Sequence, residues 1–278
     1  MEKSLEFCNS ELFWTSLEQI NRELSPLECL SYLELAVSQE VKSEESNIYY
    51  VEKVFEKLYE QLDLLQYKER IAPLEFKFLQ LKAFENGSCF HSIIKEDPGL
   101  YASCIDMLYK HEDGKEPDKK EINMSTVFDI FHTLNFCPGE TNGSIDEPVL
   151  RNWVSEFQRL LEKQHQSLLF HSFLGRLLAH SPAGDDCYEP HEAVRRLIEE
   201  IYQADIKESF YIERLNMRGI YNVTDGRDDK ILADKYRANA KALFQNYPKV
   251  ASIYSLLAEN YEKKAKEARK QAEQVDGY

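Results

Sequence analysis

The residues most capable of chemistry in this sequence lie between positions 171 and 192, where imidazole, carboxylate and thiol groups are concentrated. Imidazole and carboxylate groups are the ligands that zinc, iron and manganese take in proteins, and a loop between two helices can bring such groups together. A metal-dependent enzyme that uses three histidines and two aspartates of this cluster is therefore one hypothesis. Its candidate ligands are His171, His180, Asp185, Asp186 and His191.

The spacing within this cluster favours a structural interpretation. His171 and His180 are nine residues apart, which at about 100° per residue places them on opposite sides of one helix. Ser181-Pro182 is typical of a helix end, and Pro190 followed by Glu192 is typical of a helix start. We therefore expect residues 181–190 to form a capped loop, and we expect no bound metal.

Other catalytic arrangements lack their sequence signatures. Cys187 and His191 are four residues apart, the spacing of a thiolate–imidazolium pair on one helix face, but Pro190 between them argues against a continuous helix. The phosphate-binding pattern G-x-x-x-x-G-K-[ST], the dinucleotide pattern G-x-G-x-x-G and the zinc-protease pattern H-E-x-x-H do not occur in the sequence. We expect no catalytic residue, no cofactor and no enzymatic activity.

A second candidate site is the segment Arg218-Gly219-Ile220-Tyr221. The guanidinium and the hydroxyl could meet an anionic ligand or a partner. The glycine could equally form a tight turn between two helices. Arg218, Gly219 and Tyr221 are the residues that would carry a ligand or partner role.

The apolar residues predict the elements that must position these groups. They recur at three- and four-residue steps along most of the chain, and few runs alternate at period two. This pattern predicts an all-α fold of antiparallel helix pairs, arranged as a solenoid-like or irregular right-angled bundle. Within 231–278 it predicts two helices separated at Asn246-Tyr247-Pro248, because proline suits the first turn of a helix.

Composition predicts the domain organisation. Residues 111–120 contain no apolar residue other than one proline, which is typical of a linker or flexible loop. We expect a helical subdomain over 1–110, a polar linker or loop over 111–120, and a second helical subdomain over 121–278 that ends in the helical hairpin.

Charge and cysteine content limit the class of protein. The 278 residues carry 34 Lys and Arg against 49 Asp and Glu, a formal net charge of −15, which disfavours a nucleic-acid-binding surface. An acidic mimic of nucleic acid remains an alternative. The six cysteines are scattered without a C-x-x-C pair, as expected of buried thiols in a reducing compartment. We see no apolar run long enough to span a membrane and no secretory signal, so we expect a cytoplasmic location.

Several segments in order resemble one group of proteins. They are Ile71–Leu81, Ile94–Leu108, Gly175–Pro182, Arg218–Tyr221 and the terminal hairpin. Together they are similar to the carboxy-terminal α-helical region of large, poorly characterised bacterial multidomain proteins, some of them associated with defence. The hairpin itself resembles tetratricopeptide-type helical hairpins over about one and a half repeats, although no period of about 34 residues occurs elsewhere; an ordinary antiparallel helix pair is the alternative.

The resemblance implies a helical scaffold or sensor region whose enzymatic activity, if any, lies in another polypeptide segment. Together with the amphipathic helices, it favours a non-enzymatic scaffold or adaptor that binds a protein partner in a bacterial defence or stress assembly. The metal-dependent enzyme and the acidic nucleic-acid mimic are the two alternatives.

Overall fold

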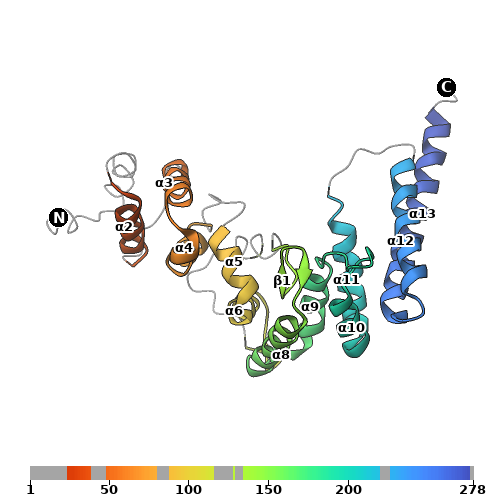
Figure 1. The fold of residues 1–278 in the computed structure, drawn as a ribbon, viewed down its shortest axis with the longest axis horizontal. Helices are drawn as coiled ribbons and strands as arrows, with labels where there is room; N and C mark the ends of the chain where they lie inside the picture. Colours follow the sequence, from red (N-terminus) through yellow and green to blue (C-terminus); the bar gives the residue numbers. More distant parts are fainter. Residues whose placement is uncertain are drawn as a thin grey trace. The chain divides into compact units, whose positions relative to one another are not determined.

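The fold is α-helical, as the apolar periodicity predicts. The computed structural model describes residues 24–38, 48–79, 88–115, 128, 134–219 and 226–275. These residues contain eleven α-helices, a short 3-10 helix and one two-stranded sheet (Figure 1). Within them, no helix has both the length and the apolar character that crossing a membrane requires.

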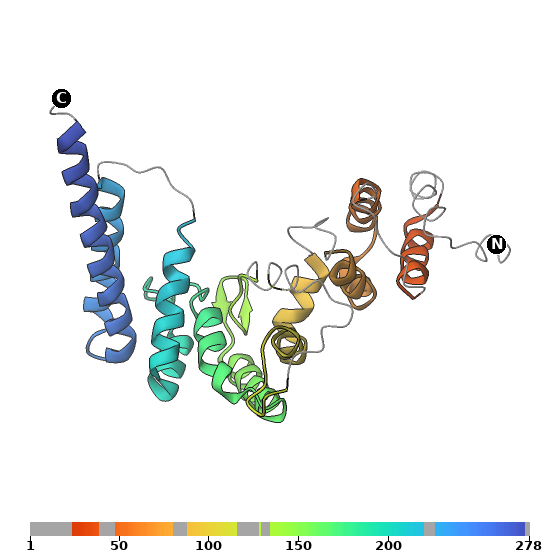
Figure 2. The same ribbon diagram turned by 180° about the vertical axis from the view of Figure 1, so that it is seen from behind.

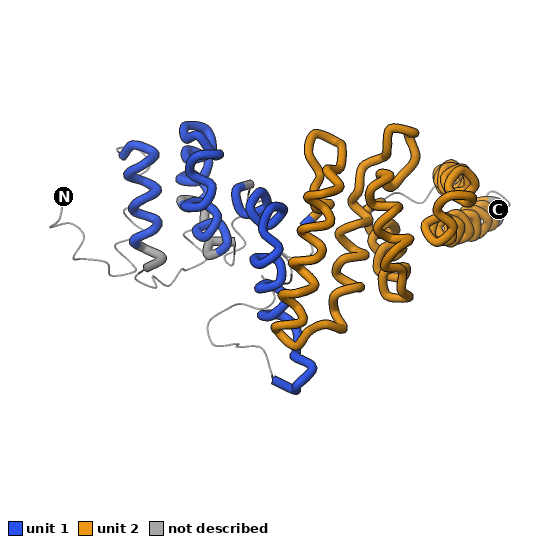
Figure 3. Tube along the Cα trace, turned by 60° about the horizontal axis from the view of Figure 1, so that its bottom comes forward, with its two compact units in different colours: residues 1–134 blue, residues 135–278 orange. Residues whose placement is uncertain are grey.

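The chain divides into two compact units, Met1–Leu134 and Asn135–Tyr278 (Figure 3). The predicted boundary at 111–120 is therefore too early. Its described part forms a tight turn inside the first unit, in which His111 N donates to Lys115 O at 3.1 Å and Gly114 N donates to His111 O at 3.0 Å. A polar segment with a glycine at positive φ, here +85° at Gly114, serves a compact turn as well as a linker. Residues 116–120 lie outside the described residues.

The first unit contains five described helices. They are α2 (Pro26–Ser38), α3 (Ile48–Gln61), α4 (Leu64–Leu79), α5 (Ser88–Glu96) and α6 (Pro98–Leu108). Helices α2 and α6 begin at prolines, and Asp97 caps α6 by accepting from Gly99 N at 2.7 Å. Ser25 and Glu28 form a reciprocal cap at the start of α2, in which Ser25 N donates to Glu28 Oε2 at 2.9 Å.

A fully buried carboxylate joins α4 to α5. Glu75 accepts the Tyr59 hydroxyl at 2.6 Å and the backbone N–H groups of Cys89 and Phe90 at 3.1 and 2.5 Å. The first N–H groups of a helix have no intrahelical partner, so Glu75 supplies from α4 the cap that α5 needs. This contact orients the two helices.

The second unit begins with a small hairpin and continues with helices. Its elements are β1 (Glu140–Thr141), β2 (Ser144–Ile145), α8 (Glu147–Lys163), the 3-10 helix η3 (Ser167–Leu169), α9 (Phe170–Leu178), α10 (Glu192–Ile201), α11 (Ala204–Asn216), α12 (Arg227–Leu243) and α13 (Pro248–Val275). The strands pair antiparallel through the turn Asn142-Gly143, where φ is +52° and +80°, the conformation that two-residue hairpins prefer. Strands of two residues are too short to show an alternating pattern, so the sequence did not reveal them.

Helices α9 and α11 approach closely at Gly175. A Cβ atom at this position would lie 2.7 Å from the backbone oxygen of Ile206 and 2.2 Å from Ser209 Oγ, both on α11. Aromatic rings fill the neighbouring core, where Phe157 lies 5.2 Å from Trp153 and 5.7 Å from Phe170 between ring centroids. The glycine therefore sets how closely the two helices pack.

The terminal hairpin forms where the sequence predicts it, with α13 starting at Pro248 and running antiparallel beside α12 (Figures 1 and 2). Glu199 of α10 caps α13 by accepting from Lys249 N at 2.7 Å and Val250 N at 3.0 Å. At the other end, Gly226 has φ +87°, and a Cβ there would lie 2.4 Å from Ala265 O. The Glu199 cap thus joins the hairpin to α10, and the Gly226 contact holds the start of α12 against α13 within the hairpin. The likeness of the hairpin to tetratricopeptide hairpins stays a prediction.

Candidate functional site

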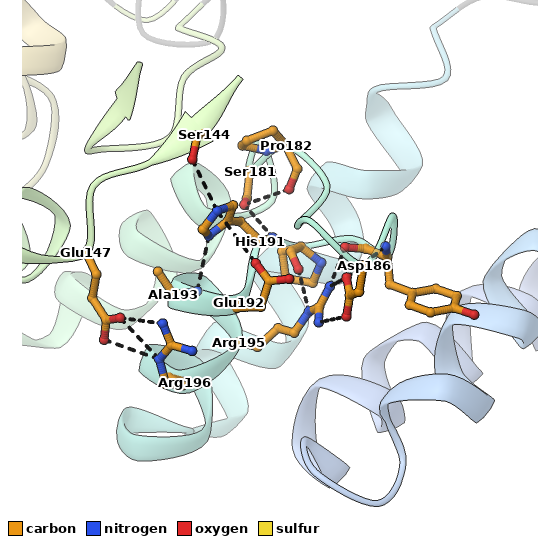
Figure 4. Close-up of polar contacts among 12 residues, drawn as sticks. Ser144, Glu147, Ser181, Pro182, Asp186, His191, Glu192, Ala193, Arg195 and Arg196 are labelled. Atoms are coloured by element: carbon orange, nitrogen blue, oxygen red, sulfur yellow. Dashed lines mark hydrogen bonds and ion pairs between the residues drawn. The ribbon is translucent and has the colours of Figure 1, made fainter. Parts of the chain in front are cut away.

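The candidate site of the second unit is the loop 179–191, which joins α9 to α10 and carries most of the polar cluster found in the sequence (Figure 4). The helix end and helix start predicted on either side of it are confirmed, since α9 ends at Leu178 and α10 begins at Glu192. The close-up shows its polar side chains directed at separate partners.

Arg195 of α10 holds the middle of this loop. Its side chain is 1% exposed, and its guanidinium donates to both carboxylate oxygens of Asp186 at 2.6 and 2.7 Å. It also donates to the carbonyl of Pro190 at 2.5 Å and to the carbonyl of Tyr188. The hydrogen bonds from Arg195 lower the pKa of Asp186 to about 2, because they stabilise the ionised carboxylate. The buried arginine therefore fixes the loop conformation.

His191 is a helix cap. Its Nδ1 accepts the backbone N–H of Ala193 at 3.2 Å, which places the proton of the neutral ring on Nε2. Nε2 lies 3.4 Å from Ser144 Oγ and 3.6 Å from Glu192 Oε2. The arrangement of Ser144, His191 and Glu192 superficially resembles a nucleophile, base and acid. In this tautomer Nε2 donates to its neighbours, whereas a general base acting on Ser144 would have to accept a proton at that atom.

His180 makes a separate contact with α11. Its Nε2 lies 2.9 Å from Glu213 Oε1, and the other oxygen of Glu213 lies 3.3 Å from Arg176 Nε of α9. All three side chains are largely buried. The Arg176–Glu213 ion pair and the His180 contact together connect the end of α9 to α11.

The remaining members of the cluster are dispersed. His171 lies on α9 with its ring 5.0 Å from that of Phe170, and burial lowers its pKa. Asp185 and Cys187 are exposed. Cys187 has φ +65°, a conformation that tight turns impose on non-glycine residues.

The structure does not bring the five candidate metal ligands together. His171, His180, Asp186 and His191 contact four different sets of partners. Within the part of the chain that the structure describes, no three His, Cys, Asp or Glu side chains are grouped so as to hold a metal ion. In this arrangement the five side chains therefore do not form a common metal site.

The second candidate segment closes the end of α11. Arg218 forms an ion pair with Asp229 of α12, and its guanidinium carbon lies 5.3 Å from the ring centroid of Tyr261. Gly219 has φ +66°, which agrees with the turn alternative. Tyr221 lies outside the described residues.

Sequence reasoning missed the buried arginines Arg195 and Arg214 and the acid Glu189, although it singled out Asp186 for a different role. Arg214 of α11, 7% exposed, pairs with Glu189 of the loop and donates to Ala179 O at 3.1 Å. One signal was available: Arg214 continues the apolar stripe of Ile206 and Phe210 at four-residue steps, and an arginine on such a stripe must be paired. Arg195 carries no comparable signal.

Comparison with known protein families, curated proteins and solved structures finds no match for this chain. The resemblance to the helical region of bacterial multidomain proteins accordingly stays a prediction.

Proposed function

We propose that this chain is a non-enzymatic helical adaptor that binds a protein partner through its outward helix faces. The proposal rests on one observation: the polar side chains Asp186, His180 and His191 all make contacts that stabilise the fold. Asp186 serves as an arginine partner, His180 as a hydrogen-bond partner of Glu213 on α11, and His191 as a helix cap. Among the described residues, exposed apolar side chains on helices are then the candidates for recognising another molecule.

Large apolar side chains on these faces are candidate anchors. Phe244, at the end of α12, is 70% exposed, and Ile231 near the start of α12 is 67% exposed. Aromatic side chains contribute a large share of the energy of protein interfaces. Phe244 is therefore the residue whose loss should weaken partner binding most. A defence or stress assembly is the setting that the sequence resemblance implies.

Affinity capture from the source organism, with partners identified by mass spectrometry at near-physiological and at high salt, tests this proposal. A stoichiometric protein that survives high salt and is lost from Phe244→Ser, but retained by the neighbouring exposed variant Gln245→Ser, supports it. Recovery of no protein above background at either salt refutes it. An acidic nucleic-acid mimic would instead capture a basic partner that high salt releases.

A further inference from the structure

The surface on which the α12–α13 hairpin packs against α11 has the composition of a protein–protein interface. Its rings belong to Phe210, Tyr236, Tyr254 and Tyr261. The Tyr254 centroid lies 6.2 Å from that of Phe210 and 5.7 Å from that of Tyr236. The guanidinium carbon of Arg214 lies 5.9 and 6.0 Å from the centroids of Tyr236 and Tyr254. Tyrosine and arginine are enriched at surfaces where separate proteins associate.

Arg214 brings a positive charge into this interface. The carboxylate that pairs with it is that of Glu189, which belongs to the loop 179–191 rather than to any of the three helices. The other oxygen of Glu189 lies 3.2 Å from Lys235 Nζ on α12. The positive charge of Arg214 between α11 and the hairpin is therefore neutralised by Glu189, a residue of the neighbouring loop.

Hydrogen bonding in this interface is incomplete. Arg214 Nε and the Tyr254 hydroxyl are both buried and have no hydrogen-bond partner in the described part of the chain. A buried polar atom without a partner loses its hydration and gains nothing in return. The interface is consequently less stable than an apolar core of the same extent, as expected of a segment that opens locally.

We propose that the α12–α13 hairpin is a releasable element and that Glu189 is the latch that keeps it docked on α11. Loss of the Glu189 contact leaves the Arg214 charge unpaired in surroundings of low dielectric. The charge regains water when the hairpin separates from α11, which uncovers the Phe210, Tyr236 and Tyr254 rings. This proposal concerns the second unit alone and does not rest on the chain being an adaptor.

Hydrogen–deuterium exchange of the full chain tests the latch. Glu189→Gln removes the negative charge and should accelerate exchange of amides in α12 and α13 by about tenfold or more, while α8 and α9 stay unchanged. Lys235→Gln is the matched control. It removes the exposed partner of the same carboxylate but leaves Arg214 paired, so exchange should rise by less than about threefold.

The double variant Arg214→Met/Glu189→Gln separates the latch from a general loss of packing. Because it removes the buried charge together with its partner, exchange in the hairpin should return towards the wild-type rate. Three results would overturn the proposal. They are equal acceleration throughout the second unit in Glu189→Gln, an equal effect of Lys235→Gln, and no recovery of the wild-type exchange rate in the double variant.

The wild-type chain provides an independent test if Glu189→Gln does not fold. When hydrogen exchange is measured at increasing urea concentration, the amides of α12 and α13 should lose protection at a lower concentration than the amides of α8 and α9. One common opening for all four helices overturns the proposal.

Discussion

Replacing Arg195 with methionine should lower the free energy of unfolding by about 3 kcal/mol, whereas the same replacement at Arg196 should lower it by less than about 1 kcal/mol. The two residues are adjacent on α10 and identical in type. Arg195 is 1% exposed and Arg196 is 45% exposed. The pair therefore isolates the effect of burial.

The larger value follows from the contacts of Arg195. Loss of the charge-assisted bonds to Asp186 costs about 1.5 kcal/mol, the low end for such bonds, because Asp186 is 43% exposed and can be hydrated. The Pro190 carbonyl loses the guanidinium donor, at a cost of about 1.5 kcal/mol. The Tyr188 carbonyl keeps the backbone N–H of Gly184 at 3.0 Å and adds little. Methionine fills most of the volume vacated by the arginine stem.

The smaller value follows from the exposure of the ion pair between Arg196 and Glu147. When Arg196 is replaced, Glu147 remains paired with Arg151, which lies 2.9 Å away. Urea unfolding followed by circular dichroism measures both variants, and limited proteolysis should cut the loop 179–191 faster only in Arg195→Met. Equal destabilisation by the two variants, or a loss below about 1 kcal/mol in Arg195→Met, would refute the assignment of Arg195 as the residue that fixes the loop.

Three further predictions concern individual contacts. Because Arg195 holds the pKa of Asp186 at about 2 against an ordinary 3.8, the stabilisation from this pair should be complete above a pH of about 4 and disappear as the pH falls towards 2. The difference in unfolding free energy between wild type and Asp186→Asn should shrink over that range in urea titrations, and a difference independent of pH would contradict the pairing. Gly175→Ala should lower stability by about 1–2 kcal/mol although alanine favours helix by about 1 kcal/mol, because the contact with Ile206 O forces α9 and α11 apart; an unchanged or higher melting temperature would show that the helices can adjust. Glu75→Gln should cost about 1–3 kcal/mol and accelerate amide exchange at the start of α5, whereas the exposed control Glu69→Gln on the same helix should have neither effect; equal behaviour of the two variants would exclude the capping role of Glu75.

Local sequence signals identified much of the helical framework. The starts at Asp97-Pro98 and Pro248 are visible because proline and a capping carboxylate act within one helical turn. The loop between α9 and α10 is visible for the same reason, since Ser181-Pro182 and Pro190 interrupt the helix pattern. The two-residue strands could not be predicted, because two residues are too few to show the alternation of apolar and polar residues that indicates a strand.

The roles of the polar residues were decided by the tertiary structure. His180 and Glu213 are 33 residues apart, and Arg214 and Glu189 are 25 residues apart, so their pairing depends on how α9 and α11 pack. Arg195 and Arg196 are indistinguishable by type and context, yet one is enclosed by the loop and the other faces Glu147. By itself the sequence indicated the all-α class and several helix boundaries, because apolar periodicity, prolines and capping residues act within a few neighbouring residues. Which charge is buried, and which carboxylate pairs with it, depends on contacts between segments distant in sequence, and these exist only in the folded chain.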